Sequence, residues 1–531
     1  MRTKFIWFCI VSLAAIAALT YFWFPAIWSL VLIGPIVIIG INDMLQTRQT
    51  IRRNFPILGH GRYWMEELRP KIYQYFIESD IDGRPFDRVS RSVVYQRAKD
   101  HLDTTPFGTQ LDVYEEGYEW MNHSIAALDS HSLEQDPRVK VGGKDCTQPY
   151  NLSLLNVSAM SFGALSKNAV LALNGGAAIG KFAHNTGEGG ISPYHLEPGG
   201  DLIWQVGTGY FGCRNDDGTF DPVSYREMSS RPNIKMIEIK LSQGAKPGHG
   251  GILPAKKNTP EIAAIRRVKP WTTVLSPPSH RTFSTPTGLL EFVARLREQS
   301  GGKPVGFKLC LGHKSEFVAI CKAMDITGIK PDFITVDGGE GGTGAAPVEF
   351  SNFVGTPLQD GLAFAYDALT GFGLKREIKI IASGKVATGF HIFRAIALGA
   401  DACNSARAMM LALGCIQSLL CNRNICPTGI TTHDPDLVAG LHVGDKKARI
   451  ANFHHETIHA FVELLAATGL RSPDDISRKY IYRNETPTHV KRYDESYPYI
   501  PENCLKNGEI PADFIVPMAE ADPDTFMPRV L

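Results

Sequence analysis

The sequence predicts an α/β protein whose main domain is a TIM-type (β/α)8 barrel, preceded by two membrane-spanning helices. Three observations support this prediction. Short apolar, β-rich segments alternate with helical patterns between about residues 150 and 410, most of these segments end in glycine-rich polar turns, and residues 5–41 contain no charge. At 531 residues and 44% hydrophobic composition, the chain is long enough for more than one domain.

The uncharged segment at the N-terminus is too long for one membrane span, since roughly 20 apolar residues cross the hydrocarbon core. Pro25 divides it into residues 5–24 and 26–41. We therefore expect residues 1–45 to form a transmembrane hairpin. A cleaved signal peptide fits less well, because the apolar run is too long and no clear cleavage site precedes polar residues.

Basic residues flank the expected hairpin on both sides: Arg2, Lys4, Arg48, Arg52 and Arg53. The positive-inside tendency then places both ends, and the body that follows, on the cytoplasmic face. In the whole chain, 55 basic residues balance 54 acidic ones, so nucleic-acid binding is not expected.

Residues 46–149 are charged and aromatic and predict a helical connector that packs on the barrel, with residues 61–79 as its clearest helix. We expect the Tyr and Trp residues of this segment to belong to a packed core. The last segment, residues 471–531, is polar and rich in proline, and predicts a closing segment after the barrel.

Residues 150–470 are expected to form the barrel. Six segments predict its strands: residues 152–163, 235–248, 304–312, 332–344, 378–389 and 401–406. Continuous apolar strands between helices indicate a parallel sheet buried on both faces. Candidate functional residues lie at the carboxyl ends of these strands. A closed barrel explains this better than an open doubly wound sheet, because all its strand ends share one rim.

The last two predicted strands end in a candidate phosphate site. Ser383, Gly384 and Lys385 follow the first, and Ser405 and Arg407 follow the second, each just before a helical pattern. Small residues let backbone N–H groups approach an anion, and a helix start adds its positive dipole end. The alternative is a pair of ordinary tight turns. Because no G-x-G-x-x-G with a following acidic residue is found, no dinucleotide domain is expected, and electrons come from another protein.

Three cysteines, Cys415, Cys421 and Cys426, lie within twelve residues, and Pro427 follows the last. Disulfides are disfavoured in a reducing cytoplasm. A zinc site lacks a fourth cysteine nearby, although His433 is a weak candidate. Three thiolates suit an iron–sulfur cluster, but the spacing alone leaves these possibilities open.

Together, six motifs resemble the FMN-binding synthase domain of glutamate synthase, over roughly residues 150–470. They are 158-SAMSFGALS-166, 185-NTGEGG-190, 237-IEIKLSQGAKPGHGG-251, 276-SPPSH-280, 338-GGEGGTGAAP-347 and 415-CIQSLLCNRNICPTGITTHDP-435. The resemblance implies a TIM-type barrel that carries FMN and a 3Fe-4S cluster. It also implies reduction of the imine formed from 2-oxoglutarate and ammonia. Cys415, Cys421 and Cys426 match the family's three cluster ligands.

The resemblance also assigns roles to single residues. Glu188, Lys246 and Arg266 match the positions that hold the dicarboxylate substrate, and the two cations suit its carboxylates. Met160 and Ser161 match the first strand end beside the flavin. Further flavin-site residues by resemblance are Lys240, Lys308, Gly342 and Thr343. For a single lysine, a structural ion pair is an equally good explanation.

Two departures affect the expected function. The substrate loop reads 246-KPGHGGIL-253, where the family usually continues with Glu-Gly-Gly-Gln after K-P-G, so His249 and Ile252 put strict 2-oxoglutarate specificity in doubt. The family's N-terminal glutaminase domain is replaced by the apolar segment, so ammonia must be supplied externally.

We therefore expect a membrane-anchored, stand-alone FMN and iron–sulfur oxidoreductase that makes glutamate, with electrons from a separate reductase subunit or ferredoxin. The alternatives are an FMN oxidoreductase acting on another oxo or imino acid, and a non-catalytic membrane flavoprotein scaffold. The joint presence of the cluster cysteines and the substrate residues favours an enzyme over a scaffold.

Overall fold

The computed structural model describes residues 1–101 and 104–529. The chain forms two compact units, Met1–Val89 and Ser90–Leu531, hereafter unit 1 and unit 2. Each unit is described by itself.

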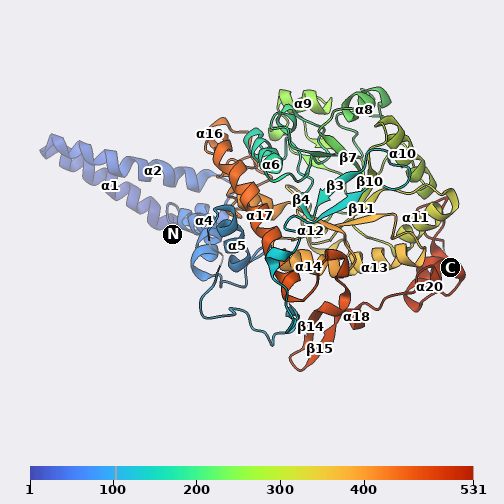
Figure 1. Ribbon diagram of the computed structural model, residues 1–531. Coiled ribbons are helices and arrows are strands. Elements are labelled where there is room, and N and C mark those ends of the chain that lie inside the picture. The colour runs from blue at the N-terminus through green and yellow to red at the C-terminus, as the bar shows by residue number, and fades with distance from the viewer. Residues whose placement is uncertain (102–103, 530–531) are drawn as a thin grey trace. The chain divides into compact units, whose positions relative to one another are not determined.

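Unit 1 begins with two apolar helices (Figure 1). Helix α1 spans Arg2–Phe22, and the 3₁₀ helix η1 (Phe24–Ser29) leads into α2 (Leu30–Leu45). Pro25 lies in η1, at the predicted division between the two segments. The stretches Arg2–Phe22 and Phe24–Leu45, of 21 and 22 residues, are both long and apolar enough to cross a membrane.

The remainder of unit 1 contains α3 (Thr50–Asn54), α4 (Gly59–Ile72) and the π-helix η2 (Tyr73–Ile77). Helices are thus found where the connector was predicted to be helical. The prediction of a packed aromatic core is wrong here: Trp64, Tyr73 and Tyr75 are 65%, 46% and 56% exposed. The reason is that, within unit 1, α4 packs mainly on η2 and the five-residue helix α3, which leaves little surface for these rings to pack against.

Unit 2 contains a closed parallel barrel of eight strands, which confirms the predicted TIM-type barrel. The strands are β4 (Leu155–Val157), β5 (His184–Asn185), β6 (Leu202–Val206), β7 (Ile234–Lys240), β10 (Val305–Leu309), β11 (Phe333–Asp337), β12 (Lys379–Ser383) and β13 (Ala402–Ser405). Neighbours follow chain order, and β13 closes onto β4. Six of the eight coincide with predicted segments.

Helices surround the barrel in the manner of βα units (Figure 1). They include α6 (Lys167–Gly180), α10 (Pro286–Gln299), α11 (Lys314–Thr327), α13 (Leu358–Gly371), α14 (Gly389–Ala397), α15 (Arg407–Leu413) and α17 (Val443–Ala467). Hydroxyl N-caps start several of them: Ser166 accepts from Ala169 N, Thr285 from Gly288 N and Thr388 from His391 N. These caps fix the residue at which each helix starts.

An apolar cluster fills the amino-terminal end of the barrel. It consists of Val141, Leu152, Ala183, Ile203, Met236, Phe333, Ile381 and Ala402, all with 0% exposure. The first two come from a hairpin of β2 (Arg138–Val141) and β3 (Tyr150–Ser153), which closes this end. Functional groups are therefore confined to the opposite rim.

The connector and the C-terminal segment differ from the prediction of a helical linker and a simple closing segment. Strand β1 (Glu119–Met121) pairs with β14 (Ile481–Thr486), which pairs with β15 (His489–Arg492). Helix α20 (Ala512–Glu520) accepts a hydrogen bond from Lys322 Nζ of α11 at Met518 O, 2.7 Å. Pairing between segments 360 residues apart leaves no local signal, so sequence periodicity did not reveal it.

Candidate functional site

Strand β7 places three side chains in successive layers of the barrel interior, because alternate residues of a strand face the same side. Met236 belongs to the apolar cluster at the amino-terminal end. Glu238 is completely buried above it and accepts hydrogen bonds from Asn185 Nδ2 (2.8 Å), Gln205 Nε2 (2.6 Å) and Thr335 Oγ1 (2.6 Å). Lys240 ends the strand at the carboxyl rim. The barrel is thus apolar below, polar in the middle and charged at the top.

Two buried ion pairs lie at this rim. Lys240 Nζ is 2.8 Å from Glu188 Oε1, and Lys308 Nζ is 3.2 Å from Asp337 Oδ2. Lys240 and Lys308 are register partners on the adjacent strands β7 and β10. Burial alone lowers the pKa of Lys308, but the carboxylates of Asp337 and Glu238 outweigh it, and the net pKa is raised. Both predicted flavin-site lysines therefore lie at strand ends with carboxylate partners.

Glu188 has further cations around it. Burial alone raises the pKa of Glu188, but Lys240, Lys246 and Arg266 outweigh it and hold the pKa below its ordinary value. Burial and the charge of Lys240 lower the pKa of Lys246 to about 8. Lys246 Nζ donates to Ala345 O (2.8 Å) and so ties the 246–253 loop to the 338–347 loop. The structure thus brings together the three predicted substrate residues.

Arg266, at the end of α9 (Pro260–Arg266), is held in place from several sides. Its Nη2 donates to Ser161 Oγ (3.3 Å) and to Phe162 O (3.2 Å), and its guanidinium carbon lies 5.1 Å from the ring centroid of Phe211. Burial lowers its pKa to about 10, opposed by the charge of Glu188, so the side chain stays cationic at neutral pH. Its buried Nε has no hydrogen-bond partner among the described residues. One donor is therefore available for a ligand.

The candidate phosphate site lies where β12 and β13 end. Ser383 and Ser405 are the last residues of these strands and are 4% and 3% exposed. Gly384 has φ +148°, a conformation that side chains rarely adopt, and Lys385 has φ +50°. Helix α14 starts five residues after Gly384, and α15 starts at Arg407. Strand ends, small residues and helix starts thus converge as predicted.

Arg407 and Gly342 lie against each other. A Cβ atom on Gly342 would be 2.9 Å from Arg407 Nε, and Arg407 Nη2 donates to Glu340 O (2.6 Å). The 338–347 loop thereby reaches the candidate phosphate site. Thr343 is exposed and donates to Ala345 O within its own loop (3.1 Å).

The three clustered cysteines share one irregular segment after α15. All ten cysteines of the chain are free thiols, which removes the disulfide explanation. Burial raises the pKa of Cys415 to about 11. Burial also acts to raise the pKa of Cys426, but hydrogen bonds with Thr428 (Sγ to Oγ1, 3.3 Å) and Thr431 together outweigh it, and the pKa is lowered.

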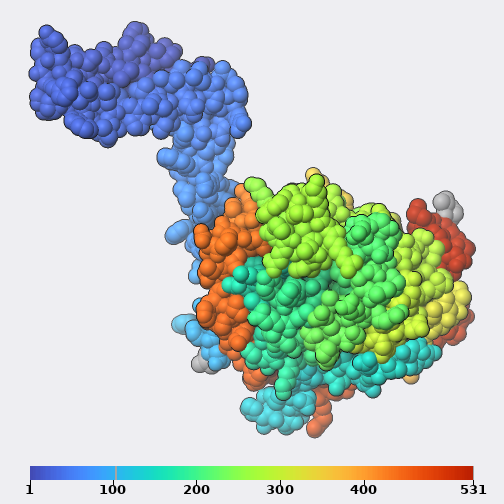
Figure 2. All heavy atoms as spheres, turned by 90° about the horizontal axis from the view of Figure 1, so that it is seen from above, coloured from blue at the N-terminus to red at the C-terminus, as the bar shows by residue number. Residues whose placement is uncertain are grey.

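Lys257 and His433 attach this cysteine segment to residues 158–166, the loop that follows β4. Lys257, 3% exposed, donates to Ala164 O (2.6 Å), Thr431 O (3.1 Å) and Cys421 O (3.3 Å). His433 Nε2 donates to Gly163 O (2.8 Å). Figure 2 shows the two segments side by side, with residues near 260 in green and residues near 430 in orange. The cysteine segment therefore contacts the loop that carries Ser161.

Comparison with known proteins places the chain in a family. The conserved region of glutamate synthase matches residues 105–471. The chain belongs to the glutamate synthase family. The resemblance found in the six sequence motifs is thus confirmed, and it places the chain among oxidoreductase enzymes.

Two relatives show how far the similarity extends. The glutamate synthase large subunit-like protein YerD of Bacillus subtilis is 37% identical over 495 residues, covering 85% of this chain and 94% of YerD. The archaeal glutamate synthase [NADPH] of Methanocaldococcus jannaschii is 37% identical over 322 residues, which cover 60% of each chain. The chain thus aligns with only part of the archaeal enzyme.

The residues at the rim of this glutamate synthase barrel fit FMN in their chemistry. Two buried serines, a glycine at positive φ, two helix starts and Arg407 suit the phosphate. Met160 is 8% exposed, and its backbone N–H donates to Asn185 O (3.4 Å), which ties the chain just after β4 to the end of β5. Lys240 and Lys308 add positive charge across the rim.

The cysteine segment fits an iron–sulfur cluster in its donor atoms but is not arranged around a common centre. Within residues 1–101 and 104–529, no three His, Cys, Asp or Glu side chains form a group ready to hold a metal. Metal binding is commonly coupled to local folding, so three thiols on one segment remain a suitable donor set.

Sequence reasoning missed four residues of the site. Asp337 is the partner of Lys308, Glu238 organises the middle layer, Lys257 joins the cysteine segment to the rim, and His280 supports Lys240. His280 Nε2 donates to Lys240 O (2.8 Å), and its Nδ1 accepts from Tyr210 Oη (3.1 Å). Burial lowers the pKa of His280 to about 4, so the ring is neutral. His280 and Glu238 each lay in a recognised motif, whereas Asp337 and Lys257 lay in none of the six.

Proposed function

We propose that this chain is a membrane-anchored, FMN- and iron–sulfur-dependent oxidoreductase of the glutamate synthase type, which reductively aminates 2-oxoglutarate to glutamate with externally supplied ammonia. The observation that carries the proposal is the cluster of Glu188, Lys240, Lys246 and Arg266 at the carboxyl rim of the barrel. Three cations around one carboxylate leave two positive charges, which match a dicarboxylate.

In this proposal, Arg266 and Lys246 bind the carboxylates of the oxo-acid. Arg266 has an unsatisfied donor for this purpose, and its other contacts fix its plane. Glu188 holds Lys240 in place and lowers the net charge of the site. When bound, FMN supplies the hydride that reduces the imine carbon, and a three-iron cluster on Cys415, Cys421 and Cys426 supplies a route for electrons from a separate donor protein.

Ser383, Gly384, Lys385, Ser405 and Arg407 are proposed to bind the FMN phosphate. Lys240 and Lys308, with Met160 and Ser161, and Gly342 and Thr343 on the adjacent loop, are proposed to border the rest of the flavin. The two ion pairs fix the positions of both lysines, so that positive charge lies beside the flavin when negative charge develops on reduction.

The anchor in this proposal is the pair α1 and the segment Phe24–Leu45, with the body on the cytoplasmic side. Its support is the length and apolar composition of both stretches and the basic residues that flank them.

The test is a product assay with the purified full-length protein. Chemically reduced enzyme is mixed with ammonia and a panel of oxo-acids, and flavin reoxidation and amino-acid products are measured. Glutamate formation with 2-oxoglutarate supports the proposal. If no oxo-acid reoxidises the flavin while FMN and iron are both present, the proposal fails, and a scaffold role or another flavin reaction takes its place.

A second candidate substrate, another oxo or imino acid, is favoured by one observation. Ile252, which stands where the family usually has glutamine, belongs to β8 (Ile252–Leu253), and the preceding Gly251 is packed against Glu188: a Cβ there would lie 2.2 Å from Glu188 Oε1. An apolar side chain beside the substrate carboxylates favours a less polar acid. A different amino acid as the main product of the panel would select this candidate.

A further inference from the structure

Helix α4 carries an uncovered apolar stripe. Trp64, Met65, Leu68 and Ile72 are 65%, 68%, 45% and 40% exposed. Their spacing of i, i+1, i+4 and i+8 places all four within an arc of about 100° on a helix of 3.6 residues per turn. A water-soluble surface helix normally buries such a stripe, so this one requires a partner.

The stripe continues beyond α4 into η2. Tyr75 and Phe76 follow Ile72 at helical spacing and are 56% and 83% exposed. The apolar surface therefore extends from α4 through the following turn and includes Trp and Tyr, which are enriched at membrane–water interfaces.

Charges border the stripe in an ordered way. By helical position, Lys71 lies next to Trp64 on one side of the stripe, and Arg69 lies beyond Met65 on the other. Glu66 lies on the opposite face, where it pairs with Arg62 (2.8 Å), and Glu67 lies beyond Lys71, outside the apolar arc. Basic residues beside the apolar arc and acidic residues away from it are typical of helices that lie on anionic lipid surfaces.

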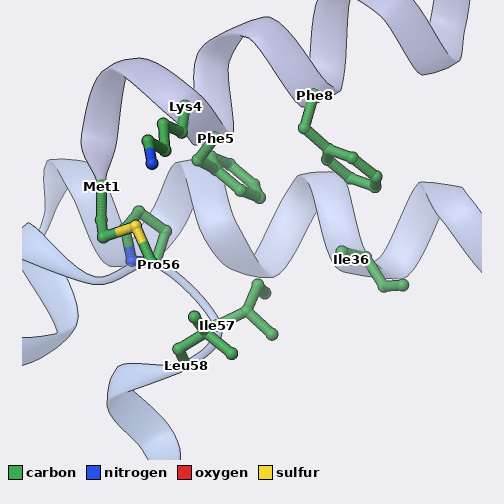
Figure 3. Close-up of a pocket in the computed structure, with 8 residues that line it drawn as sticks. All are labelled: Met1, Lys4, Phe5, Phe8, Ile36, Pro56, Ile57 and Leu58. Carbon is green, nitrogen blue, oxygen red and sulfur yellow. The ribbon is translucent and has the colours of Figure 1, made fainter.

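The start of α4 is fixed at the end of the apolar hairpin. Asp43, in the last turn of α2 and 1% exposed, accepts from Ile57 N (3.0 Å) and from His60 Nε2 (2.8 Å). Figure 3 shows Ile57 and Leu58 beside Phe5 and Phe8 of α1 and Ile36 of α2, around one pocket. In Figure 1, α4 and the N-terminus lie at the same end of the α1–α2 pair. If the hairpin spans a bilayer, α4 begins at its surface.

We propose that α4 and η2 form an interfacial helix that lies in the plane of an anionic membrane surface, with the stripe Trp64, Met65, Leu68, Ile72, Tyr75 and Phe76 embedded at the level of the headgroups. This inference rests on the membrane anchor proposed above. The helix adds a second, lipid-dependent contact that orients the juxtamembrane segment. The stripe is covered by lipid and not by a protein partner.

The test uses the full-length protein in vesicles of phosphatidylglycerol and phosphatidylcholine, with a photo-crosslinking residue at one position at a time. Leu68→p-benzoylphenylalanine and Phe76→p-benzoylphenylalanine probe the stripe, and Glu66→p-benzoylphenylalanine probes the opposite face of the same helix. Ile38→p-benzoylphenylalanine, in α2, reports insertion of the hairpin. Adducts are identified by mass spectrometry.

We expect lipid adducts at positions 68 and 76 in at least fivefold higher yield than at position 66. Replacing phosphatidylglycerol by phosphatidylcholine alone should lower the yield at 68 and 76 severalfold and leave that at 38 unchanged. Lipid adducts at 38 without any at 68 or 76 would overturn the interfacial helix while leaving the anchor intact. Absence of lipid adducts at 38 would overturn the anchor and this inference with it. Protein adducts at 68 and 76, with the same chain or a second copy, would assign the stripe to a protein contact and overturn the proposal.

Discussion

Lys240 Nζ and Glu188 Oε1 lie 2.8 Å apart, and their side chains are only 7% and 16% exposed. The pair joins the end of β7 to the turn that follows β5, two strands apart in the barrel. Because Lys246 and Arg266 also act on Glu188, a change in this carboxylate alters all three cations together. Glu188 is therefore the centre of the candidate site.

Glu188→Gln should destabilise the protein by about 3–5 kcal/mol at pH 7, because it leaves Lys240 buried without its charge partner. The folded-state pKa of Glu188 is lowered, so its contribution to stability is present above the unfolded-state value of about 4.5 and is lost as pH falls through the lower folded-state value. Denaturant unfolding between pH 7 and pH 4 should show the difference between wild type and variant shrinking below about pH 4.5. The exposed Glu197→Gln serves as control and should change stability by less than about 0.5 kcal/mol. A difference that grows in acid would contradict the ion pair.

Arg266→Ala should raise the oxo-acid concentration needed for half-maximal flavin reoxidation by about ten- to hundredfold, the scale of a lost charge-assisted contact of ~1.5–3 kcal/mol. Flavin content should be unchanged. The neighbouring Arg267, whose side chain is 43% exposed and which donates to Ser224 Oγ at 3.0 Å, provides a matched control. If Arg267→Ala raises the half-maximal oxo-acid concentration by the same factor, the effect comes from the fold of α9, and Arg266 is not a substrate residue.

Lys246 gives the site a predicted dependence on pH. Its pKa is lowered to about 8, mainly by burial, so the positive charge that binds a carboxylate is lost as pH rises past 8. The dissociation constant of 2-oxoglutarate, measured from flavin absorbance without ammonia, should be flat below pH 7 and rise by up to about tenfold per pH unit above 8. Lys246→Arg should remove this rise, because an arginine stays protonated.

The ionisation of Lys246 has opposite effects on substrate binding and on the stability of the fold. Between pH 8 and about 10.4 the unfolded state binds more protons at Lys246 than the folded state does, so this residue makes the fold more stable as pH rises. Weaker binding over this range then cannot be attributed to loss of structure at Lys246. A pH-independent dissociation constant in wild type would exclude Lys246 from the substrate site.

Much of the barrel could be predicted because six strands are continuous apolar runs that end in glycine-rich turns, a pattern set by burial on both faces. Strand β5 has only two residues, His184 and Asn185, and so has no periodicity to detect. The stripe on α4 is visible in the sequence, but its exposure depends on which elements fold beside it. Local pattern alone led to the wrong prediction of a packed core.

In the candidate site, too, some residues could be predicted from local sequence and others could not. Lys246 and Glu188 were found because each stood in a recognisable motif, Arg266 was found because its position matches a substrate residue of the family, and the structure brings the three together. Glu238 looks in the sequence like any polar residue of a strand, and Lys257 meets Thr431 across 174 residues. Partnerships of this kind are created by the closure of the barrel and are not encoded in local spacing.

Cys421→Ser should lower the iron content from roughly three per chain toward zero while most of the FMN is retained, because thiolates hold the cluster and the flavin residues lie on other segments. Iron and zinc are measured by elemental analysis and FMN by absorbance after denaturation. Cys146→Ser, outside the cysteine segment and hydrogen-bonded to Gly302 O (3.3 Å), is the control and should keep its iron. Zinc in place of iron in the wild-type protein would exclude an iron–sulfur cluster.

Deleting residues 1–45 should convert a detergent-requiring membrane protein into one that a high-salt wash releases, because both apolar stretches long enough to cross a bilayer are removed. Helix α4 and its basic residues remain in the truncated chain, so binding to anionic vesicles should persist at low salt and disappear as salt screens the charges. Sedimentation with membranes is measured at 50 mM and 500 mM salt, where the Debye length is about 14 Å and about 4 Å. The assay reports both release from the membrane and its dependence on salt. For topology, a reporter fused to the C-terminus of the full-length chain should be accessible only from the cytoplasm. Truncated protein that stays on membranes after the high-salt wash would show that the hairpin is not the anchor.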